Sequence, residues 1–197
     1  MTGHRLVLVG GGHAHVQVIR ALAQQPEPGM TITLVTDRLL TPYSGMLPGH
    51  VAGIYSHAEM HIDLGRLAEV CGVTLVGSAA AAIDRARRTV TTEDGASVPY
   101  DTLSLNVGIT PDLSGIAGAE EHGIPVKPIS SFIARLDALL EAAARADGPR
   151  RIVLVGGGAA GVELALALKA RLTGLDPKGR PFWIGLAASS GLVATLN

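Results

Sequence analysis

The sequence predicts an α/β fold in which parallel strands alternate with helices, and a duplicated phrase is the main support for it. Residues 5–16 read RLVLVGGGHAHV and residues 151–162 read RIVLVGGGAAGV. Each copy is a short apolar run, then a glycine cluster, then a helix-like run, which is typical of a strand, turn and helix that bind a dinucleotide. One such motif arises by chance. Two copies, each after a strand-like run, predict two nucleotide sites on one chain.

The composition is that of a globular protein. The 197 residues allow one large domain or two small ones, and 47% apolar with 17% charged residues lies far from the composition of disordered chains. A net charge of −1 predicts no nucleic-acid partner, and no apolar run reaches the length of a transmembrane segment. The first strand begins near Arg5 and leaves no room for a signal peptide, so we expect a cytoplasmic protein.

The beginning of the chain reads as one strand–helix–strand unit. Residues 5–9 and 31–36 are continuous apolar runs, as in parallel strands that are buried on both faces. Between them, residues 13–25 have helical periodicity and end at prolines. The apolar face of this helix is expected to contain Val16, Ile19 and Ala23.

An insertion follows the second strand. Residues 39–61 contain two prolines and two glycines within a few positions, and we predict an ordered active-site loop, because loops of this length in compact domains are usually functional. Residues 63–71 should form a helix that Gly72 ends. Residues 73–107 should form several short strands, with a hairpin at residues 93–95.

The second half repeats the first pattern once. A connector rich in Gly and Pro covers residues 115–128, and Ser130 or Ser131 should cap a helix that runs to about Ala146. The second strand–turn–helix unit then extends to about Thr173, and an apolar run follows over residues 182–188. One such unit is too little for a complete nucleotide domain, so we expect the chain to be the N-terminal half of a longer protein. The predicted domains are residues 1–112, a connector and helix over residues 113–148, and the start of a second domain over residues 149–197.

The glycines of the two turns have separate tasks. The first permits the tight turn, the second lets the backbone approach a pyrophosphate, and the third lets the helix pack close to the strand. The phosphates then bind to free amides at the helix N-terminus. The second copy has all three, Gly156, Gly158 and Gly161. The first copy has Gly10 and Gly12 but His15 in the third position, where the imidazole must either widen the helix–strand spacing or point away from the strand.

Asp37 ends the second strand, 27 residues after Gly10. A carboxylate at this point can accept both hydroxyl protons of an adenosine ribose, although an ordinary aspartate in a turn is the alternative. The second unit has no matching acid, because its last strand ends in Ala187, Ala188 and Ser189. The residues therefore leave the choice between NADH and NADPH open.

Five segments together resemble a known family. They are the first glycine turn, PYSGMLPG at residues 42–49, VPYDTLSLNVG at residues 98–108, PVKPI at residues 125–129, and GGGAAGVE at residues 156–163. The chain is similar to the flavin-containing, pyridine-nucleotide-dependent oxidoreductases, nearest to the type II NADH dehydrogenases. Within that group it resembles the NADH dehydrogenase-like proteins found fused to, or alongside, selenide, water dikinase. The implied fold is a three-layer Rossmann-like FAD/NAD(P)-binding fold with an inserted β-meander.

The resemblance also implies site residues. The first turn would hold the FAD pyrophosphate, Asp37 the ribose and backbone near Ala80 the adenine, while the segment after the meander and the 42–49 segment approach the flavin. The second turn would hold NAD(P)H. The implied FAD residues are Gly10, Gly12, His13, Ala14, Asp37, Arg38, Ser44, Ala80, Asn106 and Gly108, and the implied NAD(P)H residues are Gly156, Gly158, Gly161 and Glu163.

The implied activity is hydride transfer from the nicotinamide to flavin N5, followed by delivery of electrons to an acceptor. Because Cys71 is the single cysteine, a thiol–disulfide relay is excluded and a quinone-like acceptor is favoured. We assign no catalytic side chain and no metal site, and we interpret His57 and His61 as a solvated pair. A homodimer and attachment to a membrane surface in the intact protein stay open. The alternatives are a non-catalytic module that binds one adenine nucleotide, and a shortened product without stability of its own.

Overall fold

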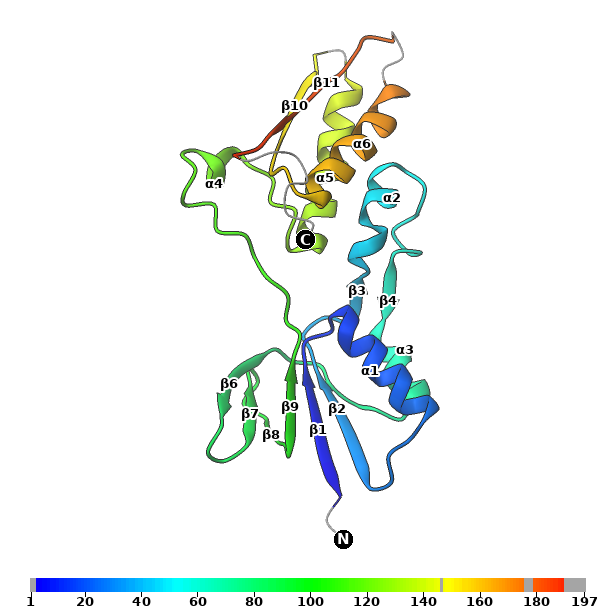
Figure 1. The fold of residues 1–197 in the computed structure, drawn as a ribbon, viewed down its shortest axis with the longest axis vertical. Coiled ribbons are helices and arrows are strands. Elements are labelled where there is room, and N and C mark those ends of the chain that lie inside the picture. Colours follow the sequence, from blue (N-terminus) through cyan, green and yellow to red (C-terminus); the bar gives the residue numbers. More distant parts are fainter. Residues whose placement is uncertain (1–2, 146, 176–178, 190–197) are drawn as a thin grey trace. The chain divides into compact units, whose positions relative to one another are not determined.

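The computed structural model describes residues 3–145, 147–175 and 179–189 (Figure 1). The chain forms two compact units, and neither is a continuous stretch of sequence. The first consists of Met1–Tyr43 and His61–Ile109, and the second of Ser44–Met60 and Thr110–Asn197. The domain boundaries expected above stay a prediction.

A four-stranded parallel sheet is the centre of the first unit. Its strand order is β5-β2-β1-β9, and the crossover after β1 (His4–Val9) is α1 (His13–Gln24), which leads to β2 (Met30–Val35). The outer strands are β5 (Thr74–Val76), next to β2, and β9 (Thr102–Leu105), next to β1. The predicted buried strands and the first helix are confirmed.

Both faces of this sheet are covered, as a parallel sheet requires. On one face α1 and α3 (Leu64–Cys71) bury Val16, Ile19 and Leu64 against Leu8 and Leu34 of the strands. On the other face lies the antiparallel meander of β6 (Ala80–Asp84), β7 (Thr89–Thr92) and β8 (Ser97–Pro99) (Figure 1). Each fully buried side chain of this size contributes about 1.5–3 kcal/mol to folding. The first unit therefore has the expected three layers and the expected inserted meander.

The helix α1 differs from expectation at one buried position, whereas α3 agrees with the prediction apart from its first residue. Ala23 is exposed, and the third buried position of α1 is instead His15, beside Val16 and Ile19. The helix α3 begins at its N-cap Asp63, whose carboxylate accepts a hydrogen bond from the Arg66 amide at 2.9 Å, and it ends as predicted at Gly72, where φ is 65°.

The prediction of one ordered loop over residues 39–61 is wrong in part, because the segment is ordered but holds regular elements, and its active-site role stays a prediction. The segment contains the antiparallel strands β3 (Leu40–Pro42) and β4 (His61–Asp63), the 3₁₀ turn η1 (Ser44–Met46) and the short helix α2 (Leu47–Val51). Of the prolines and glycines that suggested a loop, Pro48 and Gly49 lie in α2, and Pro48 is compatible with it because it occupies the first turn, where its missing N–H is not needed. Burial of Leu47, Val51 and Met60 in the second unit stabilises this structure.

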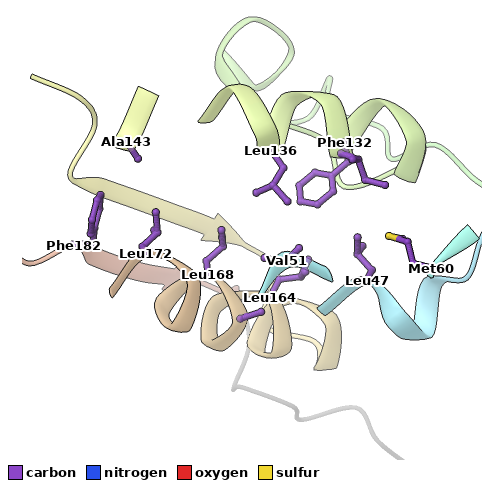
Figure 2. Packing of buried hydrophobic residues seen from close by; sticks show 12 residues of the cluster. Leu47, Val51, Met60, Phe132, Leu136, Ala143, Leu164, Leu168, Leu172 and Phe182 are labelled. Atoms are coloured by element: carbon purple, nitrogen blue, oxygen red, sulfur yellow. The ribbon is translucent and has the colours of Figure 1, made fainter. Parts of the chain in front are cut away.

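The second unit has one large hydrophobic core. Its strands β10 (Arg151–Val155) and β11 (Trp183–Ala187) are parallel, and besides α2 its helices are the short α4 (Ala119–His122), then α5 (Ile129–Ala144) and α6 (Ala159–Thr173). Figure 2 shows side chains of α5 and α6 directed toward the same apolar interior as those of α2. The buried members are Leu47, Val51, Met60, Phe132, Ile133, Leu136, Ala143, Leu164, Ala167, Leu168, Leu172 and Phe182.

The start of α5 also differs from expectation. The residue before the helix is Pro128, so neither Ser130 nor Ser131 is the N-cap, and the Ser131 hydroxyl donates to the Pro128 carbonyl at 2.9 Å. The helix ends at Ala144, and the expected end at Ala146 lies outside the described residues. Of the residues that the structure describes, no helix is long and apolar enough to cross a membrane.

Candidate functional site

The first glycine turn lies where three parallel strands end together. The Gly10 amide donates to the Val35 carbonyl of β2 at 2.8 Å, and the Asn106 amide donates to the Val9 carbonyl of β1 at 2.8 Å. Gly10 has φ of 93°, and a Cβ there would overlap the Asn106 carbonyl. Glycine is therefore required at residue 10 both for its backbone conformation and for the close approach of β9.

The helix α1 begins at this turn with Gly12 as its N-cap. No side chain of the described chain caps it, so the first-turn amides, including those of His13 and Ala14, are not satisfied by a cap. Uncapped amides and the positive end of the helix dipole favour a phosphate at this point. The side chain of Asn106 lies against Gly12, where a Cβ would overlap its carboxamide. Asn106 is thus brought to the turn through both its backbone and its side chain.

His15 bonds the turn to the sheet. Its side chain is buried, with Nδ1 2.7 Å from the Gly10 carbonyl oxygen and Nε2 2.9 Å from the Ser104 hydroxyl of β9. A carbonyl can only accept, so Nδ1 carries the proton and Nε2 accepts the hydroxyl proton of Ser104. The expectation that the imidazole points away from the strand is wrong, because it points toward the sheet.

Burial lowers the pKa of the His15 imidazole below its ordinary value, and the bond to the Gly10 carbonyl opposes that shift only in part. The neutral ring fits the tautomer that the two hydrogen bonds define. The missing third glycine was the signal for a special role, but the partner Ser104, 89 residues away, could not be read from the sequence.

His13 has a different environment at the mouth of the turn. Its ring lies 4.5 Å from that of Tyr43, centroid to centroid and tilted by 56°, and its Nε2 is 3.4 Å from Nε2 of Gln17. Tyr43, which follows β3, is exposed. The contact joins the glycine turn to the beginning of the 42–49 segment, which the resemblance implies to lie near the flavin.

The remaining residues expected at the first site are spread around the unit. Asp37 follows β2, is exposed, and has a carboxylate oxygen 3.9 Å from Nε of Arg38. Ala80 begins β6 on the meander, and Gly108, with φ of 80°, follows β9. Ser44 belongs to the second unit, so the structure does not join it to the first turn.

The second glycine turn is built like the first. The Gly156 amide donates to the Ala187 carbonyl of β11 at 2.8 Å, and Gly156 has φ of 125°. A Cβ on Gly161 would overlap the Gly156 carbonyl, so the third glycine permits the close packing of α6 on the turn. Gly158 is the N-cap of α6, and a Cβ there would meet no described atom within 4 Å apart from its chain neighbours. Glu163 is exposed one turn into this helix.

Both turns thus have the features that hold a pyrophosphate: a glycine backbone that leaves room and a helix N-terminus without a capping side chain. By contrast, the described part of the chain contains no group of three or more His, Cys, Asp or Glu side chains that could hold a metal ion.

Comparisons with known proteins agree with this geometry. Residues 4–175 match the family described as Pyridine nucleotide-disulphide oxidoreductase. A Castellaniella defragrans protein named "Probable ferredoxin reductase" is 31% identical over 170 residues, which are 83% of this chain and 39% of that protein. An NADH dehydrogenase-like protein of Mycobacterium tuberculosis is 29% identical over 187 residues, 89% of this chain and 44% of that protein.

The fold has solved counterparts as well. The crystal structure of sulfide:quinone oxidoreductase from Aquifex aeolicus superimposes with a TM-score of 0.71 at 24% identity, covering 87% of this chain and 40% of that one. The chain therefore spans less than half the length of these similar proteins.

Proposed function

The chain belongs to the pyridine nucleotide-disulphide oxidoreductase family, and on that premise we propose that the protein is an FAD-dependent NAD(P)H oxidoreductase. The observation that carries the proposal is the pair of glycine turns, each at the carboxyl end of a parallel strand and each followed by a helix with an uncapped N-terminus. Two such turns on one chain suit two dinucleotides that exchange electrons.

We assign FAD to the first turn. Gly10 and Gly12 would leave room for the pyrophosphate, the first-turn amides of α1 would bind it, and Asp37 at the end of β2 would accept the ribose hydroxyl protons. Asn106, held against Gly12, would lie beside the bound phosphates. When bound, FAD supplies a two-electron acceptor for a hydride from nicotinamide.

NAD(P)H is assigned to the second turn. Gly156, Gly158 and Gly161 provide the complete glycine pattern, and the space around Gly158 is open to a ligand backbone. Glu163 projects from the second turn of α6, beyond the amides that would bind phosphate. The chain's own residues bind and orient the nucleotides and exclude water, and no side-chain acid or base is required of them for hydride transfer.

The electron acceptor is proposed to be quinone-like. Cys71 is the single cysteine of this chain, so a pair of thiols is not available within it to carry the electrons onward. A ferredoxin is the second candidate, because the Castellaniella relative is named as a ferredoxin reductase. Reoxidation of the NADH-reduced protein by a soluble quinone analogue, compared with a ferredoxin, distinguishes the two.

The visible spectrum of the purified chain tests the proposal. The chain is incubated with FAD, desalted, and treated with NADH or NADPH without oxygen. We expect flavin absorption to be retained and then bleached by the reduced nucleotide. A colourless desalted chain contradicts the FAD assignment, and retained flavin that neither nucleotide bleaches favours the alternative of a nucleotide-binding module.

Two variants separate the sites. Gly12 and Gly158 are the N-caps of α1 and α6, with extended backbones that aspartate also adopts. At Gly158 the added Cβ meets open space, whereas at Gly12 it also displaces the Asn106 carboxamide. Aspartate caps helices well, and its carboxylate would occupy the amides proposed for phosphate. We expect Gly12→Asp to lose FAD, and Gly158→Asp to keep FAD but lose bleaching. The same loss in both variants contradicts the assignment of one nucleotide to each turn.

A further inference from the structure

The hydrogen bonds of the two turns define which residues of the two units correspond. In the first unit Val9 is paired with Val35, and the next amide, that of Gly10, donates to the Val35 carbonyl at 2.8 Å. In the second unit Val155 is paired with Ala187, and the Gly156 amide donates to the Ala187 carbonyl at 2.8 Å. The ends of β2 and β11 therefore have the same relation to their glycine turns.

The correspondence continues beyond the strands. Two residues after Val35 is Asp37, and two residues after Ala187 is Ser189. Asp37 follows Gly10 by 27 positions, but Ser189 follows Gly156 by 33. Because the segment between the glycine turn and the end of the next strand differs in length between the two units, the sequence alone does not show that these residues correspond. The shared register makes Ser189 the counterpart of Asp37.

The two residues offer a ribose different chemistry. A carboxylate at this position accepts hydrogen bonds from the 2′- and 3′-hydroxyls and repels a 2′-phosphate, which is how an acid selects NAD over NADP. A serine hydroxyl is uncharged and can donate as well as accept. Ala187, Ala188 and Ser189 are all exposed, so the end of β11 is accessible to a ligand, and the segment from Trp183 to Ser189 contains no acid.

We propose that position 189 sets the nucleotide specificity of the second site, and that Ser189, which has no charge to repel a 2′-phosphate, admits NADPH there on equal terms with NADH. The proposal rests on the function proposed above, since it concerns the ribose end of the same nucleotide. The chain thus contains its own internal comparison: the first unit has the carboxylate, suited to an adenosine with a free 2′-hydroxyl, and the second unit has the hydroxyl.

Calorimetric titration of the FAD-loaded chain with NAD⁺ and NADP⁺ tests this without turnover. We expect the two Kd values to agree within about tenfold, because the strong charge-assisted bond that would separate them is missing. Ser189→Asp introduces a carboxylate like that of Asp37 and should change the ratio of the two Kd values by about tenfold or more in favour of NAD⁺ binding. Ser189→Ala is the control, and it should leave the ratio nearly unchanged.

Asp37→Ser is the reciprocal variant. It should weaken FAD retention while the ratio of the NAD⁺ and NADP⁺ Kd values stays as in the parent chain. A parent chain that prefers NAD⁺ by well over tenfold, or a Ser189→Asp variant with an unchanged ratio, overturns the proposal for Ser189. If the FAD-loaded chain binds neither nucleotide, the proposed function itself fails, and the two failures are thereby distinguished.

Discussion

Replacing His15 with alanine tests whether this imidazole fastens the first glycine turn to the sheet. The side chain is 2% exposed and makes two hydrogen bonds, to the Gly10 carbonyl and to the Ser104 hydroxyl. Each bond contributes about 1 kcal/mol net, and a buried polar group that loses its partner costs about 1–3 kcal/mol. Because Ser104 can turn its hydroxyl to another acceptor, we expect a total loss of about 2–4 kcal/mol from the free energy of unfolding of the first unit.

The assay has to report on each unit separately, because a chain with two units need not unfold in one step. Hydrogen exchange measured by mass spectrometry on peptides from β1 and β9 reports the first unit, and peptides from α6 report the second. We expect faster exchange in β1 and β9 of His15→Ala, with α6 unchanged. FAD retention should fall in parallel, since the amides of the turn are no longer held in place.

His4 supplies a matched control on the same sheet. Its Nε2 lies 2.9 Å from the Thr102 hydroxyl, so it also contacts a hydroxyl of β9, but at an exposed position. His4→Ala should cost less than about 0.5 kcal/mol, because water replaces an exposed hydrogen bond. The reasoning is refuted if the His4 and His15 variants lose similar stability, or if His15→Ala leaves exchange in β1 and β9 unaltered.

Three further predictions follow from the same structure. Because burial lowers the pKa of His15, the unfolded chain takes up a proton on this residue at a higher pH than the folded chain does. The contribution of His15 to the free energy of unfolding is therefore complete above the ordinary histidine pKa of about 6.5 and declines below it. The urea midpoints of the parent chain and His15→Ala should accordingly converge as the pH falls from about 7.5 to 5. Parallel curves over that range contradict this. Gly161→Ala would press a methyl group on the Gly156 carbonyl, and calorimetry should show about tenfold weaker NADP⁺ binding with FAD retention unchanged; equal NADP⁺ affinity would count against the second site. Leu172→Ala empties part of the second core and should cost about 2–5 kcal/mol in urea unfolding followed by circular dichroism, whereas Leu166→Ala, on the same helix but 67% exposed, should change stability by less than about 0.5 kcal/mol; similar losses in both would contradict the packing.

Local patterns predicted much of the fold. The strands at the two glycine turns, the helices after them and the meander all follow from periodicity and turn residues that lie close together in the sequence. The helix and strands within residues 39–61 were missed because they depend on distant partners: Leu47 and Val51 are helical while packed beside α6, more than a hundred residues later. Local propensity was overruled there by tertiary packing.

In the candidate sites, too, local sequence patterns predicted some features and distant contacts determined the others. The need for Gly10 and Gly156 could be predicted from motif and spacing alone, and the backbone angles of both agree with it. The bond between His15 and Ser104 could not, because it depends on which strand lies next to β1. The relation of Ser189 to Asp37 likewise required the register of two strand pairs. The binding roles of all these residues stay predictions until a nucleotide is measured.

The packing of residues 44–60 in the second unit has a consequence for synthesis of the protein on the ribosome. Met60 leaves the ribosome about 70 residues before Phe132, its partner in the core of α5, and more than a hundred residues before most of α6. At about 5–20 residues per second, Met60 waits roughly 4 to 14 s for Phe132 to be synthesised, and the apolar side of α2 waits longer. During that interval the nascent chain displays Leu47, Val51 and Met60 to solvent, where molecular chaperones or a neighbouring nascent chain can reach them.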